Sequence, residues 1–135
     1  MKRINVDSIE FTNDYTFVLD GQLFTGIAED INSETGERSE QEIQEGVQSG
    51  VSREWTAAGT LRREAEFRNN VLHGRQREWH DDGRLWRESV YEYGICLHRT
   101  ALAPNGSVDH EYRIEDDPSQ LELLELMRKS EGDKS

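Results

Sequence analysis

The chain has 135 residues, which suits one domain, and its hydrophobic and charged residues each make up 33%. That mix argues against a compact two-layer core and favours a single sheet that is wet on much of its surface. The net charge of -12 argues against binding to nucleic acid or anionic membranes, which bind through Lys and Arg, and favours solubility or a basic partner.

The N-terminal part predicts strands joined by tight turns. Apolar residues alternate with polar ones in two runs, Ile4 with Val6, and Tyr15 with Phe17 and Leu19. Asn13-Asp14 and Asp20-Gly21 are typical turn pairs. The next stretch, residues 33–48, is polar and acidic. Two interpretations of it stay open, a degenerate hairpin around Thr35-Gly36 or a mobile loop.

Two adjacent segments, residues 50–73 and 74–97, repeat one pattern at a constant offset of 24 residues. The matched positions are Gly50 with Gly74, Arg53-Glu54-Trp55 with Arg77-Glu78-Trp79, Gly59 with Gly83, Leu61 with Leu85, Arg63-Glu64 with Arg87-Glu88, and Phe67 with Tyr91. So many matches in one register indicate a true internal repeat. Flanking copies are weaker, because His98 stands where the next Gly is expected. Degenerate terminal copies are typical of repeat arrays.

Each copy predicts a strand, a turn and a second strand, with turns at Ala57-Ala58-Gly59 and Asp81-Asp82-Gly83. A two-residue type I′ turn and a three-residue type I turn closed by a glycine bulge are both possible. We prefer the second. Ala58 resists the left-handed conformation that type I′ requires, and Pro104 in the last copy fits position i+1 of a type I turn.

The choice of turn decides which residues share a face of the sheet. The three-residue loop pairs Trp55 with Leu61 and Trp79 with Leu85. Strand alternation then adds Phe67 and Tyr91 to the same face, so that the repeats stack an apolar row. The two-residue turn instead sets the carboxylates of Glu54 and Glu78 opposite Arg63 and Arg87.

The C-terminal segment predicts a helix. Asp117 is a good N-cap and Pro118 suits the first helical position. Leu121, Leu124 and either Met127 or Arg128 recur at helical spacing. We expect this helix to cover the last strand or one face of the sheet. The expected organisation is a sheet over residues 1–115, a capping helix over 116–130 and a frayed tail over 131–135.

The copies REWTAAGTLRREAEF and REWHDDGRLWRESVY resemble the variant MORN-type repeat of bacterial YwqK-family antitoxins. The opening INVDSIEF and the ending EDDPSQLELLELMR are also similar to proteins of that group. The resemblance implies a mainly β fold, a single-layer antiparallel meander of tandem hairpins with a C-terminal α-helix. It also implies binding to another protein, with toxin neutralisation as the role that the group's name carries.

Catalytic and metal sites are not expected. Cys96 and His98 are two residues apart, which in a regular strand places them on one face, but no second ligand pair has a recognisable spacing. Cys96 is therefore interpreted as a small hydrophobe. Glu54, Glu64, Glu78 and Glu88 follow the repeat, so we interpret them as cross-strand charge partners.

Arginine and tryptophan side chains are the candidate binding residues, because both types are enriched at protein-binding hot spots. The set is Arg53, Trp55, Arg63, Arg77, Trp79 and Arg87, which share a face in the register of the three-residue loop. The competing interpretation is stacking of guanidinium groups on Trp within the sheet, and we favour it.

The sequence therefore predicts a non-enzymatic binding protein without a cofactor or metal, whose partner is another protein and not nucleic acid or membrane. The alternative is a structural scaffold that self-associates through its sheet. Cys96 is the single cysteine and no stretch approaches about 20 apolar residues. We therefore expect a soluble, cytoplasmic protein.

Overall fold

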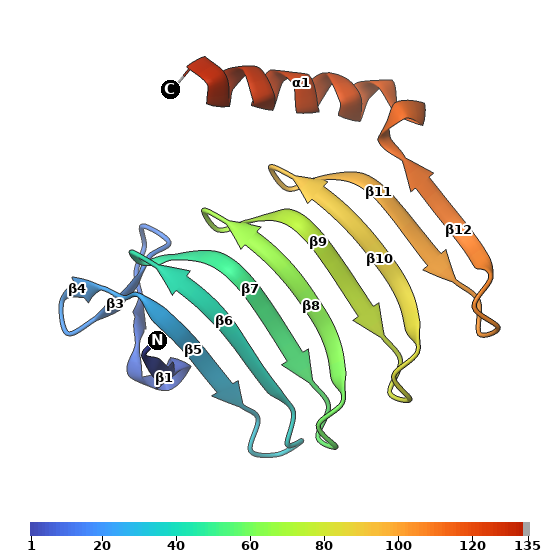
Figure 1. Cartoon of the computed structure of the whole chain (residues 1–135). Coiled ribbons are helices and arrows are strands. Elements are labelled where there is room, and N and C mark those ends of the chain that lie inside the picture. The colour runs from blue at the N-terminus through green and yellow to red at the C-terminus, as the bar shows by residue number, and fades with distance from the viewer. Residues whose placement is uncertain (134–135) are drawn as a thin grey trace.

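The computed structural model describes residues 1–133 and consists mainly of one long, open sheet (Figure 1). Nine strands lie in the order β1-β5-β6-β7-β8-β9-β10-β11-β12, and β2-β3-β4 form a second, small sheet. From β5 to β12 every strand pairs antiparallel with the next, so the predicted meander of hairpins is confirmed. Only β1 runs parallel to its neighbour β5.

The strands have the following bounds: β1 Arg3–Asn5, β2 Glu10–Phe11, β3 Phe17–Leu19, β4 Gln22–Leu23, β5 Gly26–Ile31, β6 Arg38–Gln44, β7 Val47–Trp55, β8 Leu61–Arg68, β9 Val71–Trp79, β10 Leu85–Glu92, β11 Ile95–Leu102 and β12 Val108–Arg113. Two 3-10 helices, η1 and η2, span Val6–Ser8 and Ile114–Asp116, and the helix α1 spans Pro118–Asp133.

The first strand is shorter than its alternation suggests. Val6 does not continue β1 but begins η1, where the Asn5 side chain accepts a hydrogen bond from the Asp7 N–H (2.8 Å). Asparagine is a strong N-cap and so ends the extended run. The expectation of a strand through Val6 is therefore wrong.

The acidic stretch 33–48 forms a hairpin and not a mobile loop. The loop around Thr35-Gly36 is closed by bonds from the Gly36 N–H to Asn32 O (2.8 Å) and from the Asn32 N–H to Glu37 O (2.9 Å). It joins β5 to β6, and β6 continues into β7. The first of the two open interpretations therefore holds, and the repeat architecture extends upstream of residue 50.

From β6 onward, two kinds of turn alternate along the meander and lie at opposite ends of the strands (Figure 1). At the end near α1, both residues of each turn have positive φ, as in type I′ turns: Glu45-Gly46, Asn69-Asn70 and Tyr93-Gly94. At the far end, the Gly59 N–H donates to Thr56 O and the Thr56 N–H to Thr60 O, both at 2.9 Å. With φ of +92° at Gly59, this is the predicted three-residue loop.

The pairing next to these loops confirms the expected partners and adds one bulge. Trp55 lies opposite Leu61, and in the next copy Trp79 lies opposite Leu85. One residue is then skipped, so that Glu54 lies opposite Arg63. Because consecutive residues point to opposite faces, the bulge at Arg62 reverses the facing of everything after it in β8.

Phe67 therefore lies opposite Gly50, on the face that Trp55 does not occupy. The same skip at Trp86 moves Tyr91 away from the face of Trp79. The expected continuous apolar row of Trp, Leu, Phe and Tyr is wrong. The bulge that keeps the Trp–Leu pairs also separates them from the aromatic residues further along the strand.

Apolar packing instead concentrates at the two ends of the meander. At the N-terminal end Phe24, Ala28 and Ile43 are buried beneath partly buried apolar residues of β1, η1 and the small sheet. At the C-terminal end Ile95, Ile114 and Leu124 join the last hairpin to α1. The middle strands are held by hydrogen bonds and cross-strand side-chain pairs, which suits the low apolar content.

The repeated glycines Gly50 and Gly74 lie in irregular pairing, each under a carboxylate. Glu42 Oε2 accepts a bond from the Val51 N–H (3.2 Å), and Glu66 Oε2 accepts one from the Arg75 N–H (3.4 Å). A Cβ atom at either glycine would overlap that carboxylate. The next copy has Val90 and His98 at the equivalent positions, so both members of the pair change together.

The helix α1 crosses the end of the sheet above the type I′ turns (Figure 1). Leu121 and Leu124 face the sheet, together with Arg128, which pairs with Glu92. The alternative in which Met127 faces inward is therefore wrong, and Met127 is exposed. The helix lies across the ends of the strands, so neither expected position, over the last strand or over one face of the sheet, is confirmed (Figure 1). The helix includes residues 131–133 of the expected tail, and residues 134–135 lie outside the described residues.

No helix within residues 1–133 is long and apolar enough to cross a membrane.

Candidate functional site

The six candidate Arg and Trp residues divide between the two faces of the sheet. Arg53, Trp55, Arg77 and Trp79 lie on one face, which we call the tryptophan face. Arg63 and Arg87 lie on the other, because they pair with Glu54 and Glu78. The expectation of one shared face is wrong for these two arginines, again because of the bulges at Arg62 and Trp86.

On the tryptophan face, acidic and basic residues alternate across neighbouring strands. The Arg53 guanidinium lies between Glu64 (2.8 Å) and Glu40 (3.6 Å), and Arg77 pairs with Glu88 (2.7 Å). At the N-terminal edge Arg3 extends the row by contacting Glu29 and Glu40. These contacts confirm the interpretation of Glu64 and Glu88 as cross-strand partners.

The opposite face, which we call the glutamine face, is built around the buried Gln76. Its neighbours in register are Ala65 and Ser89, which are both 2% exposed. With its oxygen turned toward Arg63, the Gln76 amide accepts bonds from Arg63 Nε (3.0 Å) and Nη2 (3.1 Å). One row further along, Arg87 pairs with Glu78. The Arg63 and Arg87 guanidinium groups are thus also engaged within the protein.

Stacking of guanidinium groups on tryptophan also occurs within the sheet. The Arg38 guanidinium lies 4.8 Å from the centre of the Trp55 ring, and that of Arg87 lies 4.7 Å from the Trp86 ring. Such pairs are common intramolecular contacts. Together with the ion pairs, they leave few arginine groups on either face free to grip an acidic ligand.

Cys96 and His98 do not form a catalytic pair. Cys96 lies opposite Tyr91 and His98 opposite Val90, which are consecutive and so point to opposite faces. The Cys96 thiol donates to the His98 carbonyl (3.6 Å), whereas the His98 ring contacts Glu111 (3.0 Å). Burial raises the pKa of the Cys96 thiol, which disfavours the reactive thiolate. Within residues 1–133 no group of three or more His, Cys, Asp or Glu residues could hold a metal ion.

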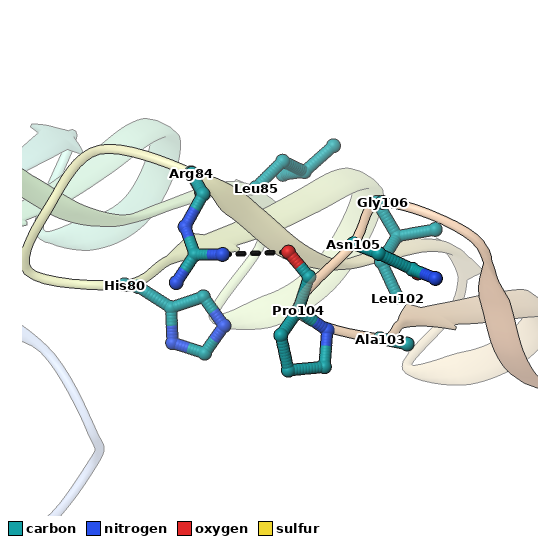
Figure 2. A pocket seen from close by; sticks show the side chains of 8 residues that line it. All are labelled: His80, Arg84, Leu85, Leu102, Ala103, Pro104, Asn105 and Gly106. Carbon is teal, nitrogen blue, oxygen red and sulfur yellow. Dashed lines mark hydrogen bonds between the residues drawn. The ribbon is translucent and has the colours of Figure 1, made fainter.

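One surface pocket, of about 320 Å³, lies between the β9–β10 and β11–β12 loops (Figure 2). Arg84 reaches across it and donates from Nη1 to Pro104 O (2.6 Å), and its Nε pairs with Asp82 (2.7 Å). His80 and Leu102 line the sides. Because Arg84 is engaged at both ends, it connects neighbouring loops and does not present a free cation to a ligand.

A second pocket, of about 370 Å³, is mainly aromatic and was not anticipated. It is lined by Phe11, Tyr15, Phe17, Gln48 and Asn70. The Phe11 ring centre lies 6.3 Å from that of Tyr15 and 4.8 Å from that of Phe17. The aromatic run is visible in the sequence, but its contact with Asn70 depends on how the small sheet folds against the β8–β9 turn.

The outer edge of β12 is the other feature that the sequence did not reveal. β12 is the last strand of the sheet order, and no described strand pairs with its outer side. Val108 at its start is 59% exposed. The helix that follows turns back across the end of the sheet that carries the type I′ turns (Figure 1) and does not cover this edge, whose residues are mostly exposed.

Comparisons with protein-family models, with curated proteins and with solved structures found no match to this chain.

Proposed function

We propose that this chain is a non-enzymatic protein-binding module that receives an extended segment of its partner along the outer edge of β12. The open edge carries this proposal. An edge strand presents a row of unpaired N–H and C=O groups, which an extended peptide pairs by β-augmentation. The faces are less suited to the role, because their arginines are engaged in cross-strand contacts.

Charge supports a basic partner. The chain has a net charge of -12; on β12, Asp109 forms no ion pair with another described residue, whereas Glu111 contacts His98 and Arg113. Charged residues on an edge strand oppose pairing of identical chains, so they favour a different, complementary partner. The resemblance to MORN-type antitoxins extends the proposal to a cytoplasmic antitoxin or immunity protein whose partner is a toxin.

The experiment is hydrogen exchange on the complex with the product of the adjacent gene, which is the first toxin candidate to test. Strand addition protects the amides of residues 108–113 when the complex forms, whereas those of the central strands stay as in the free chain. A complex in which the β12 amides exchange as fast as in the free chain overturns the edge mechanism.

Proline substitutions provide a matched control, because consecutive residues of a strand direct their N–H groups to opposite sides. Of His110→Pro and Glu111→Pro, one removes an outward N–H and the other an N–H bonded to β11. The substitution that removes the outward N–H is expected to weaken binding at unchanged melting temperature. The substitution that removes the N–H bonded to β11 is expected to lower the melting temperature. Binding that is insensitive to both speaks against the proposal. Self-association through the sheet, the alternative function, predicts instead a mass that rises with concentration in light scattering.

A further inference from the structure

The aromatic pocket of Phe11, Tyr15 and Phe17 is the second accessible feature of this molecule. We propose that it binds a cationic side chain, Arg or Lys, presented by a basic segment of a protein partner. This adds a contact site to the proposed protein-binding function. It lies on different elements from β12 and can be tested separately from the edge.

The ring arrangement suits a cation. Phe11 meets Tyr15 at an interplanar angle of 65° and Phe17 at 48°, so the rings do not lie in one flat stack. Phe11 is 55% and Tyr15 70% exposed, so ring surface remains open to a ligand. Aromatic faces carry negative potential and attract Lys or Arg, whose aliphatic stems also pack on rings.

Hydrogen bonds hold the pocket in shape before any ligand binds. The Asn70 side chain accepts from the Gln48 N–H (2.7 Å) and donates to Tyr15 O (3.1 Å), so it ties the β8–β9 turn to the aromatic loop. The Phe17 N–H donates to the carbonyl oxygen of Gly46 (2.7 Å), which belongs to the β6–β7 turn. A preformed site loses less entropy on binding.

The surroundings of the pocket are acidic. Residues 4–20, which contain the three aromatic residues, include four Asp and Glu and no Lys, Arg or His. Glu10 and Asp14 adjoin Phe11 and Tyr15 in the chain, and Glu45 belongs to the turn that contacts Phe17. None of these three carboxylates forms an ion pair with another described residue. This charge distinguishes a cationic occupant from a purely apolar one and disfavours a second copy of the acidic chain.

The test is an NMR titration of the full-length chain with four blocked tripeptides, Gly-X-Gly, in which X is arginine, lysine, norleucine or glutamate. The side-chain amide signals of Gln48 and Asn70 report directly from the pocket wall. The arginine and lysine peptides are expected to shift these signals, and added salt weakens the effect. The norleucine peptide is expected to bind at least about fivefold more weakly than the arginine peptide, and the glutamate peptide is expected not to bind.

Two variants and one control complete the design. Tyr15→Ala and Phe11→Leu each remove ring surface and are expected to weaken arginine-peptide binding about two- to fivefold. Leu126→Ala changes an exposed apolar residue of α1, outside both the pocket and the β12 edge, and leaves that binding unchanged.

Equal binding of norleucine and arginine peptides, or no shift with either cation, overturns the proposal. Signal broadening that depends on protein concentration without peptide indicates a second copy as the occupant and overturns it too. Protection of β12 in a partner complex is measured independently. Failure of the pocket therefore leaves the edge mechanism intact, and failure of the edge mechanism leaves the pocket titration interpretable.

Discussion

The Glu66 carboxylate lies over Gly74, in the space that a side chain at that glycine would need. It also accepts a hydrogen bond from the following N–H, that of Arg75. The carboxylate thus fits only where a glycine lies beneath it, and the preceding copy has the same arrangement with Glu42 and Gly50.

Gly74→Ala is expected to lower stability by more than Gly83→Ala does. Both glycines have positive φ, +120° and +89°, so each substitution costs about 1–2 kcal/mol of backbone strain. At Gly83 nothing lies within 4 Å of the new Cβ, whereas at Gly74 it meets Glu66. Urea denaturation measures both. Equal losses contradict the role of the carboxylate, and a smaller excess in the Glu66→Ala background supports it.

Leu124→Ala is expected to detach the helix. Leu124 is 2% exposed and packs with Ile95 and Ile114, and truncation of such a buried leucine costs about 2–5 kcal/mol. Leu126, 59% exposed on the same helix, is the control, and its truncation is expected to change stability by about 0.5 kcal/mol or less. Circular dichroism at the helical band reports release of the helix, and tryptophan fluorescence reports unfolding of the sheet. Comparison of the two signals separates these events. Similar effects of both variants would refute the packing described.

The docking of α1 is expected to weaken in acid. The Arg128 guanidinium, which bonds Glu92, holds the pKa of that carboxyl below its ordinary value. A folded-state pKa that is lowered stabilises the protein above the unfolded value, about 4.3, and the contribution is lost as pH falls through the folded pKa. Glu92→Gln removes this part of the pH dependence. The pair is partly exposed, so the cost at neutral pH is about 1 kcal/mol or less.

Thermal melts between neutral pH and acid check this prediction, and Glu122→Gln on the same helix is the control, since Glu122 forms no ion pair with another described residue. An identical acid response of the Glu92→Gln variant and the unsubstituted chain rules out the pair as the cause.

Arg53→Met is expected to destabilise the sheet more than Arg77→Met. Arg53 lies between two carboxylates, Glu40 and Glu64, whereas Arg77 contacts one, Glu88. Removing Arg53 leaves Glu64 without its partner and Glu40 with Arg3 alone, on the two strands that flank β7. Both sites are partly exposed, so the loss is about 1 kcal/mol for Arg53 and less for Arg77. Denaturation at low and high salt is the measurement, and the gap between the variants closes as salt screens the charges.

The repeat itself was predictable because its turns depend on local chemistry. Pro104 and the turn glycines indicate three-residue loops, and these fix the Trp55–Leu61 pair. The bulge after that pair was not predictable. Arg62 and Trp86 occupy equivalent positions but have different side chains, and neither marks an irregularity. One skipped residue was enough to divide the candidate arginines between two faces.

The candidate sites were harder to foresee, since they depend on segments far apart in the sequence. The aromatic pocket joins Phe11 and Tyr15 to Asn70, and no local pattern indicates that contact. The open edge at β12 depends on where α1 goes, and the amphipathic spacing of Leu121 and Leu124 says only that the helix has one packed side. Tertiary placement decides both.

Each 24-residue unit begins and ends at the same end of the strands and contains one turn of each kind. A further unit could therefore be inserted in the middle of the sheet without a change at either terminus. In-frame duplication of residues 50–73 would insert two strands and lengthen the sheet by about 10 Å. The N-terminal and C-terminal packing clusters would keep their own contacts. The distance between the aromatic pocket and the outer edge of β12 would increase by a fixed step with each added copy, so the number of copies sets the spacing of the two proposed binding features.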